Sequence, residues 1–213
     1  MQSDGRIPFE EEQPLTTPQE NASADRRASN RYRTVCRVAR VRRTDDTGLW
    51  RVRNISDDGL MLSAAVLMEV GERLEIALSE AVTLVGEIVW TEGGRCGVAF
   101  LEPIDAAATL RALAAERRDE SNRALQLPIE VQAIVTLRDN ERAIDLIDIS
   151  QNGAGFQYET PLEAGTEIEL LLPGIKRRRQ ALVRWSRGLR GGLWFPEPLD
   201  LTDLESIARF QRP

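Results

Sequence analysis

NISDDG, residues 54–59, is a polar turn between two runs of alternating apolar residues, and it indicates the fold of the chain. Alternation with a period of two is typical of β-strands that bury one face. Gly59 allows the positive φ of a tight turn, or a close approach of the backbone to a ligand. We therefore expect one β-strand to end at this turn and another to begin there.

Further short β-like runs surround this pair. Turn signals at residues 45–48, 70–72 and 93–94 separate six such runs between residues 34 and 101, which favours a closed barrel over an open sheet. After Pro103 the period changes, and residues 105–119 are predicted to form a helix with Asp105 as its N-cap. Its apolar stripe comprises Ala107, Leu110, Leu113 and Ala114.

The second half of the chain repeats the first. DISQNG, residues 148–153, matches NISDDG at an offset of 94, and Gly165 matches Gly71 at the same offset. At an offset of 95, Trp90, Phe100 and Pro103 match Trp185, Phe195 and Pro198. Landmarks in register indicate tandem domains of one fold. We assign an acidic, disordered tail to residues 1–24 and the two domains to residues 25–119 and 120–213. A C-terminal helix with a capping-box pattern at Thr202 and Glu205 is predicted to close the second.

An arginine-rich segment, DRRASNR at residues 25–31, precedes the first β-run. The guanidinium groups of Arg27 and Arg31 can bind a phosphate bidentately, or the O6/N7 edge of guanine. Asn54 and Ser56 lie two residues apart, so an extended strand projects them from the same side. Their oxygens suit the N1 and N2 donors of guanine.

These two motifs resemble the signature of the PilZ family, an arginine arm RxxxR or RRxxxR followed by (D/N)xSxxG. The resemblance implies a mainly β chain of two tandem six-stranded antiparallel PilZ-type β-barrels, each followed by an α-helix. It also implies a bacterial receptor for cyclic di-GMP. The implied ligand-binding residues are Arg26, Arg27, Arg31, Asn54, Ser56 and Gly59. In the family the RRxxxR form is associated with a stacked ligand dimer, and Asn54 replaces the commoner, stronger acceptor Asp.

The second domain lacks the arm in register, because the offset of 94 carries Arg27 onto Ser121 and Arg31 onto Leu125. Without two charge-assisted contacts, binding there should weaken by at least about a hundredfold. We therefore interpret this domain as a degenerate copy for interaction or packing. The alternative is that Arg118 and Arg123, spaced by five, adapt. That second candidate site comprises Asp148, Ser150, Gly153, Arg118 and Arg123.

Composition restricts the function classes. The net charge is −6, yet residues 26–53 hold ten arginines and two aspartates, a focused patch that suits a small anion better than bulk nucleic acid. The chain has no histidine, and Cys36 and Cys96 lie in separate β-like runs, so a zinc site or a Cys/His nucleophile is not expected. We expect both cysteines to be reduced core residues, no metal or cofactor, and no enzymatic activity.

Two further segments concern partners and compartment. No apolar run reaches the ~20 residues of a membrane span and no signal sequence stands at the N-terminus, so the cytoplasm is the expected compartment. KRRR at residues 176–179 is predicted to be a solvated loop, with a docking patch for an acidic partner or RNA as the alternative.

The function expected from the sequence is therefore a cyclic di-GMP effector. Ligand binding at the first domain would order the arm, change the conformation and signal to a protein partner. A PilZ-fold interaction scaffold that binds no nucleotide is the alternative, and an RNA-binding barrel is a third interpretation, which the guanine-reading motif disfavours.

Overall fold

The computed structural model describes residues 32–116, 124–138 and 140–211, with only the backbone at residues 32–36 and 211. Several sequence predictions fall outside these ranges. They concern the tail (residues 1–24), the side chain of Cys36, and the arginines Arg26, Arg27, Arg31, Arg118 and Arg123.

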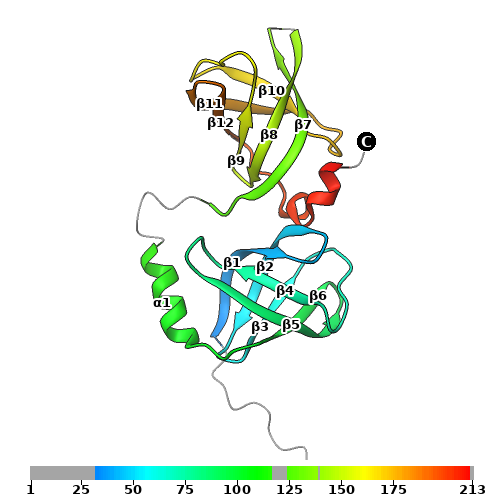
Figure 1. The fold of residues 1–213 in the computed structure, drawn as a ribbon, viewed down its shortest axis with the longest axis vertical. Coiled ribbons are helices and arrows are strands. Elements are labelled where there is room, and N and C mark those ends of the chain that lie inside the picture. The colour runs from blue at the N-terminus through cyan, green and yellow to red at the C-terminus, as the bar shows by residue number, and fades with distance from the viewer. Residues whose placement is uncertain (1–31, 117–123, 139, 212–213) are drawn as a thin grey trace, which may run out of the picture.

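The first barrel is a closed antiparallel sheet, as the sequence predicts. In barrel order its strands are β1 (Tyr32–Arg42), β2 (Thr47–Ile55), β3 (Gly59–Ser63), β6 (Arg95–Phe100), β5 (Thr83–Glu92) and β4 (Arg73–Ala77) (Figure 1). Inward-facing side chains such as Trp50, Leu62 and Ile76 are fully buried and fill the core. Cys96 joins them as a free, buried thiol, which confirms its predicted core position.

The second barrel repeats this order, which confirms the tandem repeat. Its strands in the same sequence are β7 (Leu127–Leu137), β8 (Asn140–Ser150), β9 (Gly153–Gln157), β12 (Arg190–Trp194), β11 (Arg179–Arg187) and β10 (Glu167–Leu171). Its own cluster of buried side chains includes Phe156 and Phe195.

Helix α1 (Ala106–Glu116) follows the first barrel. Its predicted N-cap is confirmed, because the Asp105 carboxylate accepts the Ala108 N–H at 2.7 Å. Leu113 is buried, and its carbonyl accepts from the Arg37 guanidinium of β1 at 3.3 Å. Ala114 is exposed, so the predicted apolar stripe is narrower than expected. No helix in the described ranges is long and apolar enough to span a membrane.

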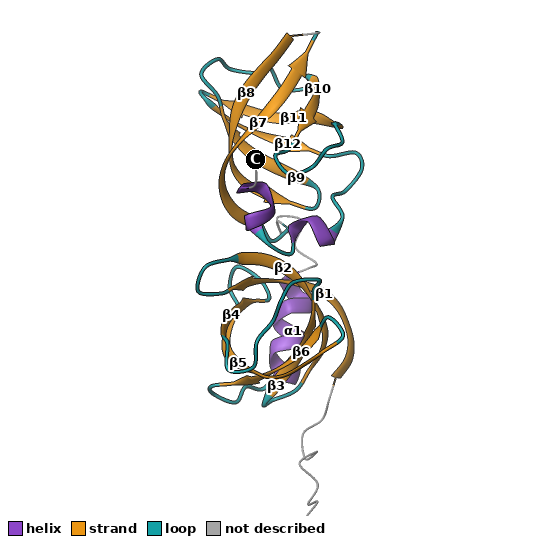
Figure 2. Cartoon of the chain, turned by 90° about the vertical axis from the view of Figure 1, so that its right-hand side faces the viewer, coloured by secondary structure: helices purple, strands orange, loops and turns teal. Residues whose placement is uncertain are grey.

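Two short 3₁₀ helices, η1 (Leu201–Leu204) and η2 (Ile207–Gln211), replace the α-helix predicted after the second barrel (Figure 2). The predicted capping box is wrong. Asp200 holds the N-cap position without a side-chain cap, and the Glu205 carboxylate instead accepts the Ala65 N–H of the first barrel at 2.6 Å. The Glu205 carbonyl accepts from the Trp50 indole at 2.9 Å. The carboxylate and carbonyl of Glu205 therefore bond to the first barrel, whereas in one continuous helix they would serve its cap and its internal hydrogen bonds.

This segment joins the barrels end to end (Figure 2). At the start of β2 the alternation of burial breaks, because Gly48, Leu49 and Trp50 are all buried. Trp50 points into the first core, whereas Leu49 packs into the second. A Cβ at Gly48 would collide with the Glu205 carbonyl, so only glycine permits this approach.

Candidate functional site

The signature turn of the first barrel is held by its own serine. Both the backbone N–H and the hydroxyl of Ser56 donate to the Gly59 carbonyl, at 2.8 and 3.1 Å. Ser56 is 9% exposed. Its hydroxyl hydrogen is therefore used inside the turn, which is the structural role that Ser favours at such positions.

Gly59 is needed for close packing of strands, because a Cβ there would collide with the Val98 carbonyl of β6. Of the two roles the sequence suggested, positive φ is wrong, because Gly59 does not have it. The close approach is real, but it is made to a neighbouring strand.

The two aspartates of the turn bond the start of helix α1 and the end of β6. The Asp57 carboxylate accepts the Ala106 N–H at 2.9 Å, and the Asp58 carbonyl accepts the Phe100 N–H at 2.9 Å. The turn is thus fixed from both sides, which gives its outer face a defined shape.

Asn54 lies on that outer face, and Met61 of β3 separates it from an exposed indole. Ile55 is buried inside, so strand alternation places Asn54 outside. Across the sheet, Asn54 pairs with Met61, Met61 with Gly97, and Gly97 with Trp90. A Cβ at Gly97 would collide with the Trp90 indole, so the ring lies over this glycine. Trp90 is 39% exposed.

Sequence reasoning used Trp90 only as a landmark of the repeat and missed its place on this face. The available signal was a tryptophan and a glycine repeated together, Trp90 with Gly97 and Trp185 with Gly192. A large ring over a glycine in both halves indicates an aromatic surface that the fold retains.

The arm region enters the barrel beside this face. The first residues of β1 pair with the last of β2, Tyr32 with Ile55 and Arg33 with Asn54. Arg31 is bonded directly to Tyr32.

The wider basic patch predicted around the ligand is reduced by the structure. Arg40 and Arg42 lie at the far end of β1 and Arg43 directly follows it, about 30 Å from the start of the strand at ~3.3 Å per residue. They form ion pairs with Glu80, Glu75 and Glu72, respectively. The hydrogen bonds that Arg43 donates to the Glu72 carboxylate raise the pKa of Arg43, and burial opposes this shift. These charges are neutralised in place and do not face the signature turn.

The second barrel repeats the turn, but the residue at the position of Asn54 is Asp148, whose carboxylate accepts hydrogen bonds from the same barrel. Ser150 donates to the Gly153 carbonyl at 3.1 Å, as Ser56 does to Gly59. The Asp148 Oδ1 atom accepts the Gly155 N–H and the Gln126 Nε2 amide, both at 2.9 Å. A cavity of about 510 Å³ lies on this face. Asp148, Ser150 and Gly153 are thus brought together.

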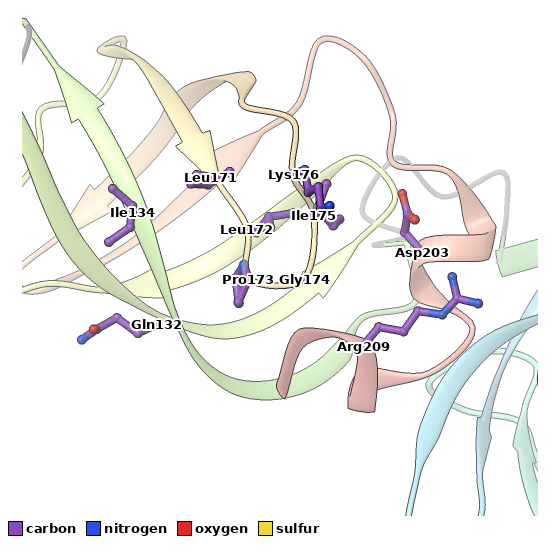
Figure 3. A pocket seen from close by; sticks show the side chains of 10 residues that line it. All are labelled: Gln132, Ile134, Leu171, Leu172, Pro173, Gly174, Ile175, Lys176, Asp203 and Arg209. Carbon is purple, nitrogen blue, oxygen red and sulfur yellow. The ribbon is translucent and has the colours of Figure 1, made fainter. Parts of the chain in front are cut away.

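The basic loop at residues 176–179 is exposed over its first three residues, as predicted. Its arginines contact the same barrel: Arg178 pairs with Glu141, and Arg179 donates to the Glu197 carbonyl at 3.0 Å. Burial lowers the pKa of Arg179. Figure 3 shows a cavity of about 790 Å³ where this loop faces Asp203 and Arg209. Internal pairing weakens the docking-patch alternative.

Metal binding has little support in the described ranges, where Cys, Asp and Glu side chains form no group of three that could hold an ion. The thiol of Cys96 has its pKa raised to about 11 by burial, so it is protonated at neutral pH.

Comparison with known proteins identifies the repeat. The PilZ domain family model matches residues 25–116 and again residues 115–211. No curated protein matches the chain. One similar solved structure is the Borreliella burgdorferi PlzA protein in complex with c-di-GMP, with 14% identity, coverage of 81% of this chain and 86% of that one, and a TM-score of 0.37. The Bacillus subtilis inhibitor of motility MotI/DgrA has 10% identity, coverage of 81% and 94%, and a TM-score of 0.32. Escherichia coli YcgR in complex with c-di-GMP has 14% identity, coverage of 75% and 76%, and a TM-score of 0.26.

Proposed function

Because this chain belongs to the PilZ domain family, we propose that its first barrel is a receptor for cyclic di-GMP. The observation that carries the proposal is the pairing of Arg33 with Asn54 at the start of β1. It brings the start of β1, which directly follows Arg31 in sequence, to the edge of the face that holds Asn54 and the Trp90 indole. Phosphate-binding cations, a base-reading acceptor and a stacking surface are thereby supplied within one domain.

Each residue has a distinct role in the proposed site. Arg27 and Arg31 bind phosphate and the O6/N7 edge of guanine, and Asn54 accepts from the N1 and N2 donors. Trp90 offers its exposed ring to a base. Ser56 and Gly59 act through the shape of the turn. Arg26 extends the arm for a second, stacked ligand.

Binding is proposed to convert ligand concentration into a change of shape. Two phosphates compensate the mutual repulsion of the arm arginines, so the bound arm can rest on the barrel and alter the surface that a protein partner meets. The protein acts without catalysis. Trypsin tests this step directly, because it cleaves after arginine: ligand should slow cleavage at Arg26, Arg27 and Arg31, whereas equal rates would contradict it.

Calorimetric titration of cyclic di-GMP into the full chain tests the receptor function. Arg27→Ala and Arg31→Ala should each weaken binding by about 10- to 150-fold, the value of one charge-assisted contact of ~1.5–3 kcal/mol. Arg42→Ala is the matched control, because Arg42 pairs with Glu75 at the far end of β1. Point variants are preferable to separated halves, because Leu49 of the first barrel belongs to the second core.

The same titration separates the receptor from the scaffold alternative. Binding that Arg42→Ala retains and Arg31→Ala loses supports the receptor. No heat at several temperatures, together with unchanged tryptophan fluorescence, would refute the receptor function and favour a scaffold.

A further inference from the structure

The equivalent face of the second barrel carries different side chains from the face of the first. Matched strand register places Asp148 where the first barrel has Asn54, and Gly155 where it has Met61. Two further replacements, each given with its first-barrel counterpart, are Arg184 for Val89 and Trp194 for Ala99. Gln126 directly precedes Leu127, which pairs with Ile149 as Tyr32 pairs with Ile55 in the first barrel. The face has therefore gained a carboxylate, a cation and an indole while losing the arm in register.

Two paired glycines form the floor of this face. Gly155 of β9 and Gly192 of β12 are directly opposite each other. A Cβ on Gly155 would collide with the Asp148 carboxylate, and one on Gly192 with the Trp185 indole. Cross-strand partners project to the same face, so the carboxylate and the indole lie side by side over the glycines.

This arrangement has the components of a base-binding pocket. Its cavity of about 510 Å³ is lined by Asp148, Arg184, Trp185 and Trp194, among others, and lies within the ~300–1,000 Å³ range of ligand pockets. Trp185 and Trp194 are 46% and 43% exposed. Stacking surfaces, an acceptor for N–H donors and a cation for phosphate suit a guanine nucleotide.

Gln126 occupies one oxygen of the carboxylate acceptor in that pocket. Its side-chain amide donates to Asp148 Oδ1 at 2.9 Å, as the N1 or N2 donor of a guanine would. The first barrel fixes its backbone, because the Gln126 carbonyl accepts from Arg40 Nη1 at 3.0 Å, and Arg40 is paired with Glu80. Gln126 is therefore held at its side-chain amide by Asp148 and at its backbone carbonyl by Arg40.

We propose that Gln126 is an internal gate, which closes the second barrel to guanine nucleotides by taking the place of the guanine donor edge on Asp148. The proposal rests on the proposed function for its ligand class. If the second barrel had only lost the arm, removing one neutral side chain would not create binding. The gate predicts that removing the Gln126 side chain does create binding, with Arg184 as the cation.

The test uses the full chain with Arg31→Ala, which weakens the first site equally in every variant of the series. Cyclic di-GMP is titrated into this variant and into the same variant carrying Gln126→Ala, with tryptophan fluorescence and calorimetry as readouts. Freeing a charged acceptor should tighten binding by about tenfold or more. Gln132→Ala is the matched control, because Gln132 is an exposed glutamine of β7, the strand that Gln126 precedes. Cyclic di-AMP controls for the base.

Adding Asp148→Ala to the open variant should abolish the gain. If Gln126→Ala does not fold, as judged by thermal melting, Gln126→Asn shortens the amide while keeping its chemistry. The proposal is overturned if the open variant binds no more tightly than the Gln132→Ala control, or if the gain survives Asp148→Ala. Loss of wild-type binding would refute the receptor function alone, because the first site is the same in every variant of the Arg31→Ala series.

Discussion

Leu49→Ala tests whether a residue of the first barrel stabilises the second barrel. Leu49 is 2% exposed and belongs to the first barrel by sequence, but it packs in the core of the second. Truncating a buried leucine costs about 2–5 kcal/mol through lost burial and the cavity left behind. The cost should fall on the second barrel, although the substitution lies in β2.

Hydrogen exchange read by mass spectrometry locates that cost. A loss of about 2 kcal/mol raises an opening equilibrium roughly 30-fold, and the exchange of the slowest amides should rise with it. Leu62→Ala is the matched control, because Leu62 is fully buried in the first core only. The reasoning fails if Leu49→Ala leaves the amides of β7 to β12 unchanged, or if Leu62→Ala affects them equally.

Three further perturbations test the faces and the core. Gly97→Ala should displace the Trp90 indole, at an overpacking cost of about 1–3 kcal/mol in the free energy of unfolding. It should also weaken cyclic di-GMP binding and shift the tryptophan emission, and unchanged emission would contradict the packing of the ring on Gly97. Arg40→Ala, added to the Arg31→Ala variant, should partly release Gln126 and raise ligand affinity by less than Gln126→Ala does; no change would remove Arg40 from the gate. Burial raises the pKa of Cys96 from 9.0 to about 11, so above pH 9 the unfolded chain loses a proton that the folded chain keeps, and stability falls as pH rises. Urea unfolding at pH 8 and 10.5 should show a larger loss in the wild type than in Cys96→Ala, and equal losses would contradict this.

The fold was largely predictable because its signals are local and repeated. Alternation, glycine turns and a 94-residue offset specify strands and their order without knowledge of contacts. The helix after the second barrel was not predictable. Thr202 and Glu205 have capping-box spacing, but Glu205 bonds Ala65 and Trp50 of the other barrel. Those partners are about 140 and 155 residues away in sequence, and no local pattern contains them.

The candidate site was predictable in residue type and less so in role. Asn54 and Ser56 were predicted to project from the same side of an extended strand. Asn54 lies on the outer face, but β2 ends at Ile55 and the buried Ser56 bonds inside the turn. Gly59 likewise serves the packing of the turn. Counting arginines overstated the patch, because a charge count ignores position along an extended strand. Arg42 and Arg43 are near in sequence to the arm but are paired with glutamates at the opposite end of β1.

The end-to-end arrangement gives the two faces unequal surroundings. In the first barrel the junction uses the start of β2, about 20 Å from the signature turn at ~3.3 Å per residue, and Figure 1 places the beginning of β1 at the end away from the second barrel. In the second barrel, Gln126 joins the junction to Asp148 directly. In the proposed function, a face at the free end would exchange ligand without disturbing the junction, whereas opening the other face would require the Gln126 contact to break. Changes at the junction, such as Arg40→Ala, should therefore alter the second face and leave ligand affinity at the first unchanged.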